Sequence, residues 1–422
     1  MTRSAFIYCG TESASVLTGV LADDGTIRHI GSLSVAPESD ALVSSAAGFS
    51  AKLSGAPRVE WVTAHPSGTW LYSFVSFWDK RPGILRTHAI ADDGELTEVD
   101  GGEEEASCHL KMRGYQPCHA VWQGTLCACA HYLSGDIEVF DMSSGGSPRN
   151  AAFARLPGKR RQGKFEAPAF GEIAPHCHGL AACPGWLVCC DAGQACLVVY
   201  SLDQASGQLG QPQPCSLGES PVVGSAGQAL VAASMGPRPR HVAFTAQHER
   251  LAVLCECTNV VTLHAFDIAD GSVGPALHTC ASFESMPRSV GCGIARSLAS
   301  LLPTKVALLA ALPFGLAAAA EVALHPPSGR LLVTTRGVPR GGSLRGLDPQ
   351  SLASLQDIAA GDSPRSFTFD RAGSTLIACV KGGLETYRVA PDGEVSSRTV
   401  SGLPEGLHGL EVDCVECVER SA

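Results

Sequence analysis

The sequence predicts a seven-bladed β-propeller, an all-β fold, on three observations. Short apolar segments bounded by turn residues recur along the whole chain, which is typical of many short strands. Glycine, with 46 residues, and proline, with 26, are frequent enough to supply the turns between them. Groups of four segments repeat at roughly 45 to 60 residues, the size of a four-stranded antiparallel blade. We therefore expect a single domain over residues 1–422.

The repeat becomes visible when the residue that opens the first strand of each blade is taken as an anchor. The anchors are Trp61, His119, His178, His241, Val322 and Ser366. A second apolar segment follows each anchor and closes at Ser76, Tyr132, Ala192, Glu256, Arg336 or Lys381. Turn signals such as His65-Pro-Ser-Gly68 and Asp370-Arg-Ala-Gly373 separate the two segments. These units predict six blades.

The third strands and the seventh blade complete the predicted ring. Third strands are expected at Asp136–Asp141, Cys196–Ser201, Val260–Phe266 and Leu384–Val389. The N-terminal region supplies three further strands, Ala5–Thr11, Val16–Leu21 and Ile30–Val35, but no first strand. We expect the C-terminal segment Gly406–Val412 to provide it. N- and C-terminal strands would then share one blade, which closes the ring and leaves no free sheet edge.

An insertion interrupts the repeat between the anchors His241 and Val322, where the interval is longer than elsewhere. We assign it to residues 282–319 and expect it to be partly helical, because Ile294–Leu302 has the apolar spacing of a helix. It could cap the ring, join subunits or form a poorly ordered excursion. The apolar run Val306–Leu324 is too broken for a membrane helix, so a buried or docking helix is favoured.

Composition restricts the partners and the compartment. A formal charge of −10 argues against nucleic acid or an anionic membrane as the main partner. Many of the 18 cysteines stand in apolar runs, where cysteine acts as a small buried hydrophobe. The residues Met1–Phe6 have no signal-peptide pattern, so we expect reduced thiols and a cytoplasmic location. The lone Cys414-Val-Glu-Cys417 motif favours a terminal strand over zinc or redox chemistry.

Polar residues gather where the blades begin. In an antiparallel blade the start of the first strand and the end of the second lie at the same end of the sheet. The anchors and closing positions should therefore face one mouth of the propeller channel. The polar residues placed there are His119, His176, His178, Arg240, His241, Glu256, Arg336, Arg365 and Lys381. Each alone could simply satisfy turn hydrogen bonds, but their common placement favours a functional site.

The residue types favour an anionic, carbonyl-bearing small substrate. Arginine forks bind carboxylate or phosphate with two hydrogen bonds, and histidine and glutamate are suited to proton transfer. The His176-Cys-His178 pair suggests a metal, but no third ligand has convincing spacing, so no metal or other cofactor is expected. The sequence also lacks a G-x-S-x-G elbow, a Walker loop and a dinucleotide fingerprint between a strand and a helix.

An ordered set of short motifs spans nearly the whole chain. The motifs are Tyr8–Thr11, Ala64–Gly68, Gln116–His119, His131–Tyr132, Ala174–His178, Gly236–His241, Leu254–Glu256, Ala320–Val322, Thr335–Gly337 and Gly361–Arg365. Together they resemble the lactonase family of seven-bladed propellers, which includes bacterial 6-phosphogluconolactonases and fungal carboxy-cis,cis-muconate lactonizing enzymes. The chain departs from the family pattern where Arg238-Pro239 splits the Gly-Pro-Arg-His motif. The family often has asparagine where this chain has His131, Cys255, Thr335 and Val380.

The resemblance implies that His178, Arg240, Glu256 and Arg336 are catalytic. The two arginines would hold the anionic groups and stabilise negative charge on the lactone oxygen, while His178 or Glu256 would move the proton or activate water. We expect the remaining mouth residues, His119, His176, His241, Arg365 and Lys381, to bind substrate.

Three functions follow as hypotheses. The first is hydrolysis of a sugar-acid lactone, in particular 6-phosphogluconolactone to 6-phosphogluconate in the pentose phosphate pathway. The second is a cycloisomerase of the carboxymuconate type. The third is a non-catalytic propeller that serves as an interaction platform. The first two both need an anion clamp and a proton carrier, so the sequence leaves them open.

Overall fold

Seven antiparallel sheets make up almost all of the described chain. The computed structural model describes residues 3–35, 56–77, 81–99, 109–158, 174–218, 221–223, 226–283, 316–338, 341–403 and 411–421. The chain divides into two compact units. The first unit comprises Met1–Ala154, Asp203–Gln208 and Arg365–Ala422, and the second comprises Arg155–Leu202 and Leu209–Pro364.

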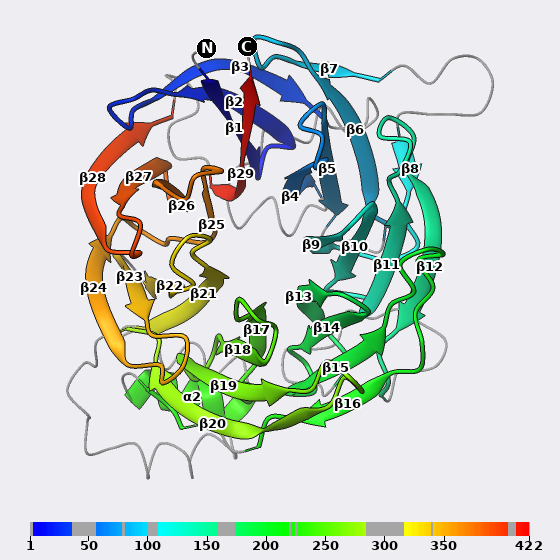
Figure 1. The fold of residues 1–422 in the computed structure, drawn as a ribbon, viewed down its shortest axis with the longest axis vertical. Coiled ribbons are helices and arrows are strands. Elements are labelled where there is room, and N and C mark those ends of the chain that lie inside the picture. Colours follow the sequence, from blue (N-terminus) through cyan, green and yellow to red (C-terminus); the bar gives the residue numbers. More distant parts are fainter. Residues whose placement is uncertain are drawn as a thin grey trace. The chain divides into compact units, whose positions relative to one another are not determined.

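The first unit holds four blades (Figure 1). One blade has the strand order β29 (Val412–Ser421), β1 (Arg3–Thr11), β2 (Ser15–Leu21), β3 (Ile27–Ser34). The next contains β4 (Pro57–Ala64), β5 (Trp70–Phe77), β6 (Ile84–Ile90) and β7 (Leu96–Glu98), with β8 (His109–Lys111) also paired to β6. The third contains β9 (Pro117–Gln123), β10 (Leu126–His131), β11 (Asp136–Asp141) and β12 (Arg149–Arg155). The fourth contains β25 (Phe367–Phe369), β26 (Thr375–Val380), β27 (Gly383–Val389) and β28 (Val395–Gly402).

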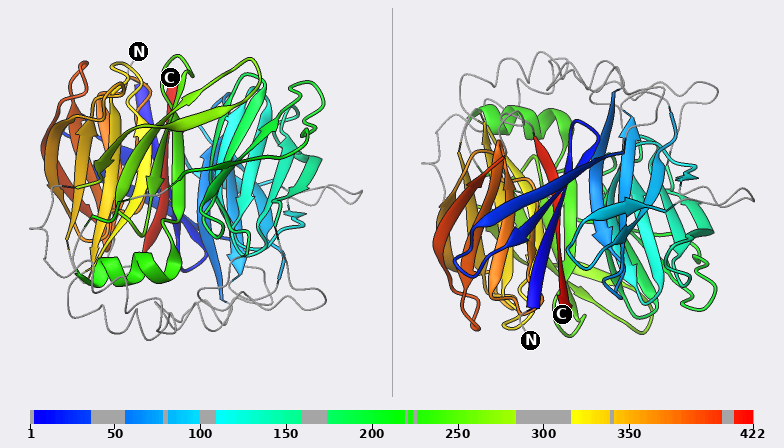
Figure 2. Two further views of the ribbon diagram at one scale, coloured as in Figure 1. Left: turned by 90° about the horizontal axis from the view of Figure 1, so that it is seen from below. Right: turned by 90° about the horizontal axis from the view of Figure 1, so that it is seen from above.

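The second unit holds three blades and one helix. Its first blade contains β13 (Cys177–Cys183), β14 (Trp186–Asp191), β15 (Cys196–Ser201) and β16 (Gln213–Ser216). The next contains β17 (Pro239–Phe244), β18 (Arg250–Cys255), β19 (Val260–Phe266) and β20 (Val273–Ala281). The last contains β21 (Leu316–Leu324), β22 (Leu331–Val338), β23 (Gly342–Leu347) and β24 (Ser354–Ala360). The helix α2 (Ala226–Met235) lies at one end of these strands (Figure 2).

The predicted fold is confirmed, including the blade shared by the two ends of the chain. The third strands lie where the sequence placed them, at β11, β15, β19 and β27. The C-terminal strand was placed too early, because β29 begins at Val412 and pairs with β1 from Thr11 to Arg3. Its buried Val412, Cys414 and Val418 supply the apolar face, so the lone Cys-x-x-Cys motif is part of a strand. The residues 404–410 lie outside the described chain.

The insertion is shorter than predicted at its C-terminal end. Leu316–Ala319, assigned to the insertion, belong to β21 and pair with residues Val338 to Thr335 of β22. The favoured helix over Val306–Leu324 is therefore wrong for its described part, since pairing and burial outweigh the helix propensity of alanine. The expected helix at Ile294–Leu302 lies outside the described residues. No helix among the described residues is long and apolar enough to cross a bilayer.

The helix α2 was not predicted. Its Gln228 is buried and donates to the carbonyl of Cys257 at 2.6 Å, while its side-chain oxygen accepts from the amide of Ala317 at 3.0 Å. These bonds join the helix to the entry of β21 and to the turn after β18. The helix thus depends on tertiary contacts that its sequence alone does not reveal.

Packed apolar side chains between successive blades form the cores of both units. In the second unit, Val188, Leu197, Val242 and Leu251 belong to one such cluster. Cysteines take part as expected of small buried hydrophobes: Cys127, Cys129, Cys189, Cys190, Cys255 and Cys257 are all buried. The cysteines of the described residues are free thiols.

A β-bulge recurs in one end strand of the blades, here called the leading strand of each blade. The leading strands are β29, β4, β9, β13, β17, β21 and β25. In all of them except β25, the described register shows one extra residue relative to the neighbouring strand. The extra residues are Asp413, Glu60, Cys118, Arg240 and Ala320, and in β13 the extra residue is either His178 or Gly179. A bulge disturbs strand alternation and re-aims side chains, and bulges concentrate near active sites.

Candidate active site

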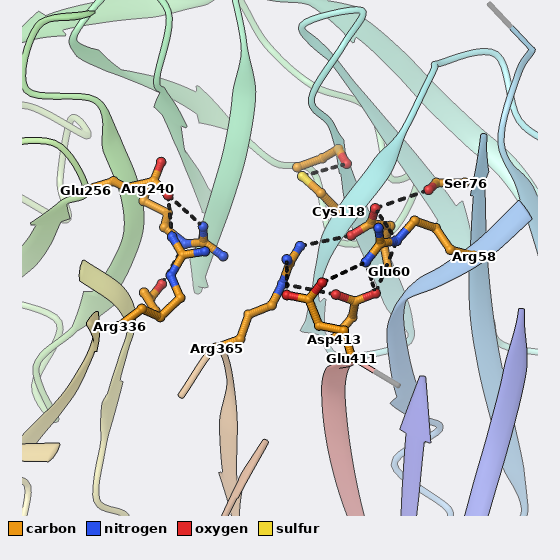
Figure 3. A network of polar contacts seen from close by, with 12 residues as sticks. Arg58, Glu60, Ser76, Cys118, Arg240, Glu256, Arg336, Arg365, Glu411 and Asp413 are labelled. Atoms are coloured by element: carbon orange, nitrogen blue, oxygen red, sulfur yellow. Dashed lines mark hydrogen bonds and ion pairs between the residues drawn. The ribbon is translucent and has the colours of Figure 1, made fainter. Parts of the chain in front are cut away.

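Three arginines of the second unit lie close to one carboxylate, that of Glu256. Figure 3 shows two of them, Arg240 and Arg336, directed to Glu256. Glu256 follows β18, whereas Arg240 comes from the bulge of β17 and Arg336 from β22. Arg240 Nη1 donates to Glu256 Oε1 at 3.2 Å, and Arg336 Nη2 donates to the same oxygen. Arg238 Nε lies 3.9 Å from the other oxygen, Oε2. The structure therefore brings together three of the four residues predicted to be catalytic.

The electrostatics of this cluster keep Glu256 ionised. Burial would raise the pKa of its carboxyl group, but Arg240, Arg336 and Arg238 together lower that pKa to about 2. Three guanidinium groups facing one carboxylate leave an excess of positive charge. The Glu256 side chain is 21% exposed and that of Arg336 is 15% exposed, so both are partly accessible from solvent. The cluster is thus suited to hold an anion.

Two consecutive residues of β17 contact two consecutive residues of β21. Arg240 Nε donates to the carbonyl of Ala320 at 2.7 Å, and His241 Nδ1 lies 2.8 Å from Glu321 Oε1. In a regular strand, successive side chains point to opposite faces. The bulge at Arg240 removes this alternation, which lets both side chains reach the same neighbouring strand.

His178 lies beside His241. The two imidazole rings meet edge to face, with centroids 5.1 Å apart, and His178 stands at the bulge of β13. The adjacent Gly179 permits this approach, because an added Cβ would lie 2.4 Å from the carbonyl oxygen of Arg240. His178 is therefore joined to the arginine cluster through β17.

Asp191 holds the backbone of His176. Its amide donates to Asp191 Oδ1 at 2.9 Å, and the same oxygen accepts from the amides of Gly193 and Gln194, each at 3.0 Å. The side chain of His176 is buried. Asp191 thus fixes the turn that leads into β13 and so positions His178.

A second ionic network lies in the first unit and contains the predicted substrate-binding residue Arg365 (Figure 3). Arg365 Nη2 donates to Glu60 Oε2 at 3.1 Å, and Arg365 Nε lies 3.3 Å from Asp413 Oδ1. Arg365 Nη1 lies 3.7 Å from Glu411 Oε1. Arg58 Nε lies 3.1 Å from both Glu60 Oε1 and Asp413 Oδ2. Three carboxylates face two arginines, the reverse of the balance around Glu256.

Burial sets the ionisation of this network. Burial raises the pKa of Asp413 to about 6, and the carboxylates of Glu60 and Glu411 act in the same direction. Arg58 and Arg365 oppose the rise. The network links the entry of β25 with β4 and the shared strand β29, so its first role is to join blades of the first unit.

The other two predicted substrate-binding residues of the first unit differ in exposure. His119 on β9 is buried, with its ring centroid 4.4 Å from that of Trp61. Lys381 lies in the exposed turn after β26. Their assignment to substrate binding stays a prediction.

Arg238, Glu321 and Asp413 take part in the two ionic networks and in the contact with His241, but they were not among the site residues predicted from the sequence. A detectable signal existed for the last two, since each is an acidic residue within a run of apolar strand residues. A buried charge in a strand needs a partner, so such positions point to ion pairs. The partners themselves come from other blades and cannot be located from local spacing.

The seven antiparallel blades define the chain as a seven-bladed β-propeller. The chain belongs to the lactonase family of seven-bladed β-propellers, whose sequence model matches residues 15–393. No curated protein matches the chain.

Solved structures share the fold at low sequence identity. A protein from Lactobacillus plantarum has a TM-score of 0.68 at 15% identity, with 99% of each chain covered. A candidate 6-phosphogluconolactonase from Bacteroides uniformis has a TM-score of 0.66 at 15% identity, covering 99% of this chain and 100% of its own. The periplasmic gluconolactonase of Pseudomonas aeruginosa has a TM-score of 0.63 at 15% identity, covering 98% of this chain and 99% of its own. At this identity the likeness concerns the fold alone.

Proposed function

We propose that the chain hydrolyses the lactone of a sugar acid, with 6-phosphogluconolactone as substrate and 6-phosphogluconate as product. The observation that carries the proposal is the excess of positive charge around Glu256, where Arg238, Arg240 and Arg336 face a single carboxylate. Membership of the lactonase family supports a lactone as the substrate class. A phosphorylated lactone would supply the anion that the three guanidinium groups favour.

The two ionic networks differ in what they can bind. The network around Arg365 already has three carboxylates for two arginines, so a further anion there would be repelled. The Glu256 cluster has the opposite balance. We therefore place the substrate phosphate and the lactone carbonyl at the arginines of the second unit.

In the proposed reaction, a water oxygen attacks the lactone carbonyl carbon and negative charge develops on the carbonyl oxygen. Arg240 and Arg336 would stabilise that charge through their N–H groups. The lactone C–O bond then breaks, and its oxygen takes a proton to become a hydroxyl group. Glu256 is a weak proton acceptor because its pKa is about 2, so it serves to orient the arginine forks. The proton transfer then falls to His178 and the histidine beside it.

A carboxymuconate-type cycloisomerase is the second candidate. Its substrate carries several carboxylates, and three arginines around one glutamate would also suit that charge. In either case the proposed partner is a small anionic molecule, and the proposed compartment is the cytoplasm, where the free thiols would stay reduced.

The test is a rate measurement on the purified full chain. Hydrolysis of 6-phosphogluconolactone and of gluconolactone would be followed above the spontaneous rate, with carboxymuconate lactonization measured in parallel. The phosphorylated lactone should be hydrolysed fastest, and Arg336→Ala and His178→Ala should each lower the rate at least tenfold. Arg149→Ala is the control, because the Arg149 side chain is 70% exposed and pairs with Asp141 rather than with Glu256. Lactonization without hydrolysis would favour the cycloisomerase, and activity on neither substrate by a folded protein would favour an interaction platform.

A further inference from the structure

His241 and Glu321 form a buried pair beside the arginine cluster. His241 Nδ1 lies 2.8 Å from Glu321 Oε1, and both residues are buried. A histidine that donates its Nδ1–H to a carboxylate carries the lone pair of its neutral ring on Nε2. The same arrangement orients the histidine of many hydrolytic sites, since the carboxylate also stabilises the imidazolium that forms on protonation.

The carboxylate of Glu321 is itself held in place. Oε1 accepts a hydrogen bond from the amide of Val322 at 3.2 Å, and the amide of Glu321 donates to Thr334 Oγ1 at 3.1 Å. The bulge at Ala320 lies next to Glu321, as the bulge at Arg240 lies next to His241. Matching bulges on β17 and β21 thus set the arginine and the histidine side by side against the same strand.

We propose that His241, oriented by Glu321, takes the proton from the attacking water in the lactonase reaction, with Glu321 as a positioning residue. This proposal rests on the proposed function. As the water oxygen bonds to the carbonyl carbon, its proton passes to His241 Nε2. When the lactone C–O bond breaks, the same proton is delivered to the departing oxygen. His178, whose ring lies edge to face with that of His241, would confine the ring and share the transfer.

The charged groups around His241 are consistent with this role. Arg240 precedes it on β17 and is directed to Glu256 and to the Ala320 carbonyl, which places the charge-stabilising group next to the proton acceptor. His178 approaches from β13 and Glu321 from β21. A carbonyl oxygen held by Arg240 would therefore lie on the side of the site where His241 can activate water.

The experiment compares Glu321→Gln, Glu321→Ala and His241→Gln in the full chain with the same phosphorylated lactone. His241→Gln should lower kcat by about 10²–10⁴-fold, the usual contribution of a general base. Glu321→Gln keeps a hydrogen-bond acceptor but loses the charge, so kcat should fall about 10–100-fold with little change in KM. The kcat of Glu321→Ala should fall further than that of Glu321→Gln, so that glutamine partly rescues the loss caused by alanine. Glu385→Gln is the matched control, because Glu385 is another buried glutamate, paired with Arg398 and Tyr387 of its own blade.

Two measurements distinguish a positioning role of Glu321 from a role in stabilising the fold alone. In Glu321→Gln the acid limb of the kcat/KM profile should move to lower pH, because the amide no longer stabilises the protonated imidazole. The NMR titration of the His241 ring should move in the same direction, and this measurement needs no activity. Unchanged kcat in Glu321→Gln and His241→Gln, or an unchanged His241 titration in folded Glu321→Gln, would overturn the proposal. If the wild-type chain hydrolyses no lactone while the titration moves as expected, the proposed function fails and the pairing stands.

Discussion

Arg336 and Arg240 donate to the same oxygen, Oε1 of Glu256, from two different blades. A single carboxylate therefore sets the separation of two guanidinium groups whose blades follow one another in the second unit. Because each guanidinium group holds its N–H donors in a planar fork, the shared contact also sets the direction in which the two forks point. The geometry of the proposed anion clamp thus depends on Glu256 as much as on the arginines.

Replacing Arg336 should affect the reaction more than the fold. Arg336→Ala removes a donor to the developing oxyanion, for which a loss of about 10²–10³-fold in kcat is typical. Arg336→Lys keeps the charge but not the planar fork, so an intermediate loss is expected. Steady-state kinetics on the phosphorylated lactone would measure both, with Arg149→Ala as the control. Equal rates in wild type and Arg336→Ala would remove Arg336 from the site.

The contribution of Glu256 to the stability of the fold should be lost in acid. Its pKa is about 2 in the folded state, below the ordinary value of 4.5, so its contribution is fully present above about pH 4.5 and is lost as the pH falls towards 2. The pKa difference corresponds to about 3 kcal/mol. Unfolding followed between pH 7 and pH 3 should therefore show a smaller loss of stability in Glu256→Gln than in wild type. Glu95→Gln, at an exposed turn, is the control and should follow the wild-type curve.

Asp413 should have the opposite pH dependence. Burial raises its pKa to about 6 from the ordinary value of 3.8, so between these values the folded chain holds a proton that the unfolded chain has released. Stability should therefore fall as the pH rises from about 4 to 6, by roughly 2–3 kcal/mol for this group. Asp413→Asn has no proton to release there and should show a flatter profile. Thermal unfolding at several pH values, with exposed Asp23→Asn as the control, would measure the difference. Parallel profiles for all three proteins would contradict the expectation.

Gly179 should be intolerant of any side chain. A Cβ at this position would lie 2.4 Å from Arg240 O and 2.7 Å from the Cα of His241, so β13 would have to move away from β17. Overpacking of this kind costs about 1–3 kcal/mol, and a displacement of about 1 Å at a catalytic group can cost 10²-fold in rate. Gly179→Ala should therefore lower both the melting temperature and kcat. Gly31→Ala on β3, where an added Cβ meets nothing within 4 Å, should leave both unchanged.

The sequence was sufficient to predict the blade repeat, since alternating apolar segments and turn residues are local signals. Strand β11 at Asp136–Asp141 and strand β15 at Cys196–Ser201 lie where they were expected. The helix α2 and the start of β21 at Leu316 were not predicted, because tertiary contacts decide between helix and strand in alanine-rich segments. The position of β29 was missed for a related reason: its partner β1 lies at the other end of the chain.

The sequence allowed residues of the candidate site to be named, but not the contacts between them. Register placed Arg240, Glu256 and Arg336 at corresponding strand ends, and the structure brings them into contact. The contact of His241 with Glu321 requires a bulge in each of two strands, and a bulge has no reliable sequence pattern. Arg365, predicted from its position alone, is held by carboxylates that local spacing could not identify.

The extra residues of the leading strands have a consequence for how this protein could change over evolutionary time. Each of them stands outside the regular ladder of its strand pair, so its side chain can be exchanged without altering which backbone groups bind one another. Glu60, Arg240 and Ala320 occupy equivalent positions yet differ in charge and size. A point substitution at such a position can therefore change the substrate preference of the site while the strands of the blade stay paired.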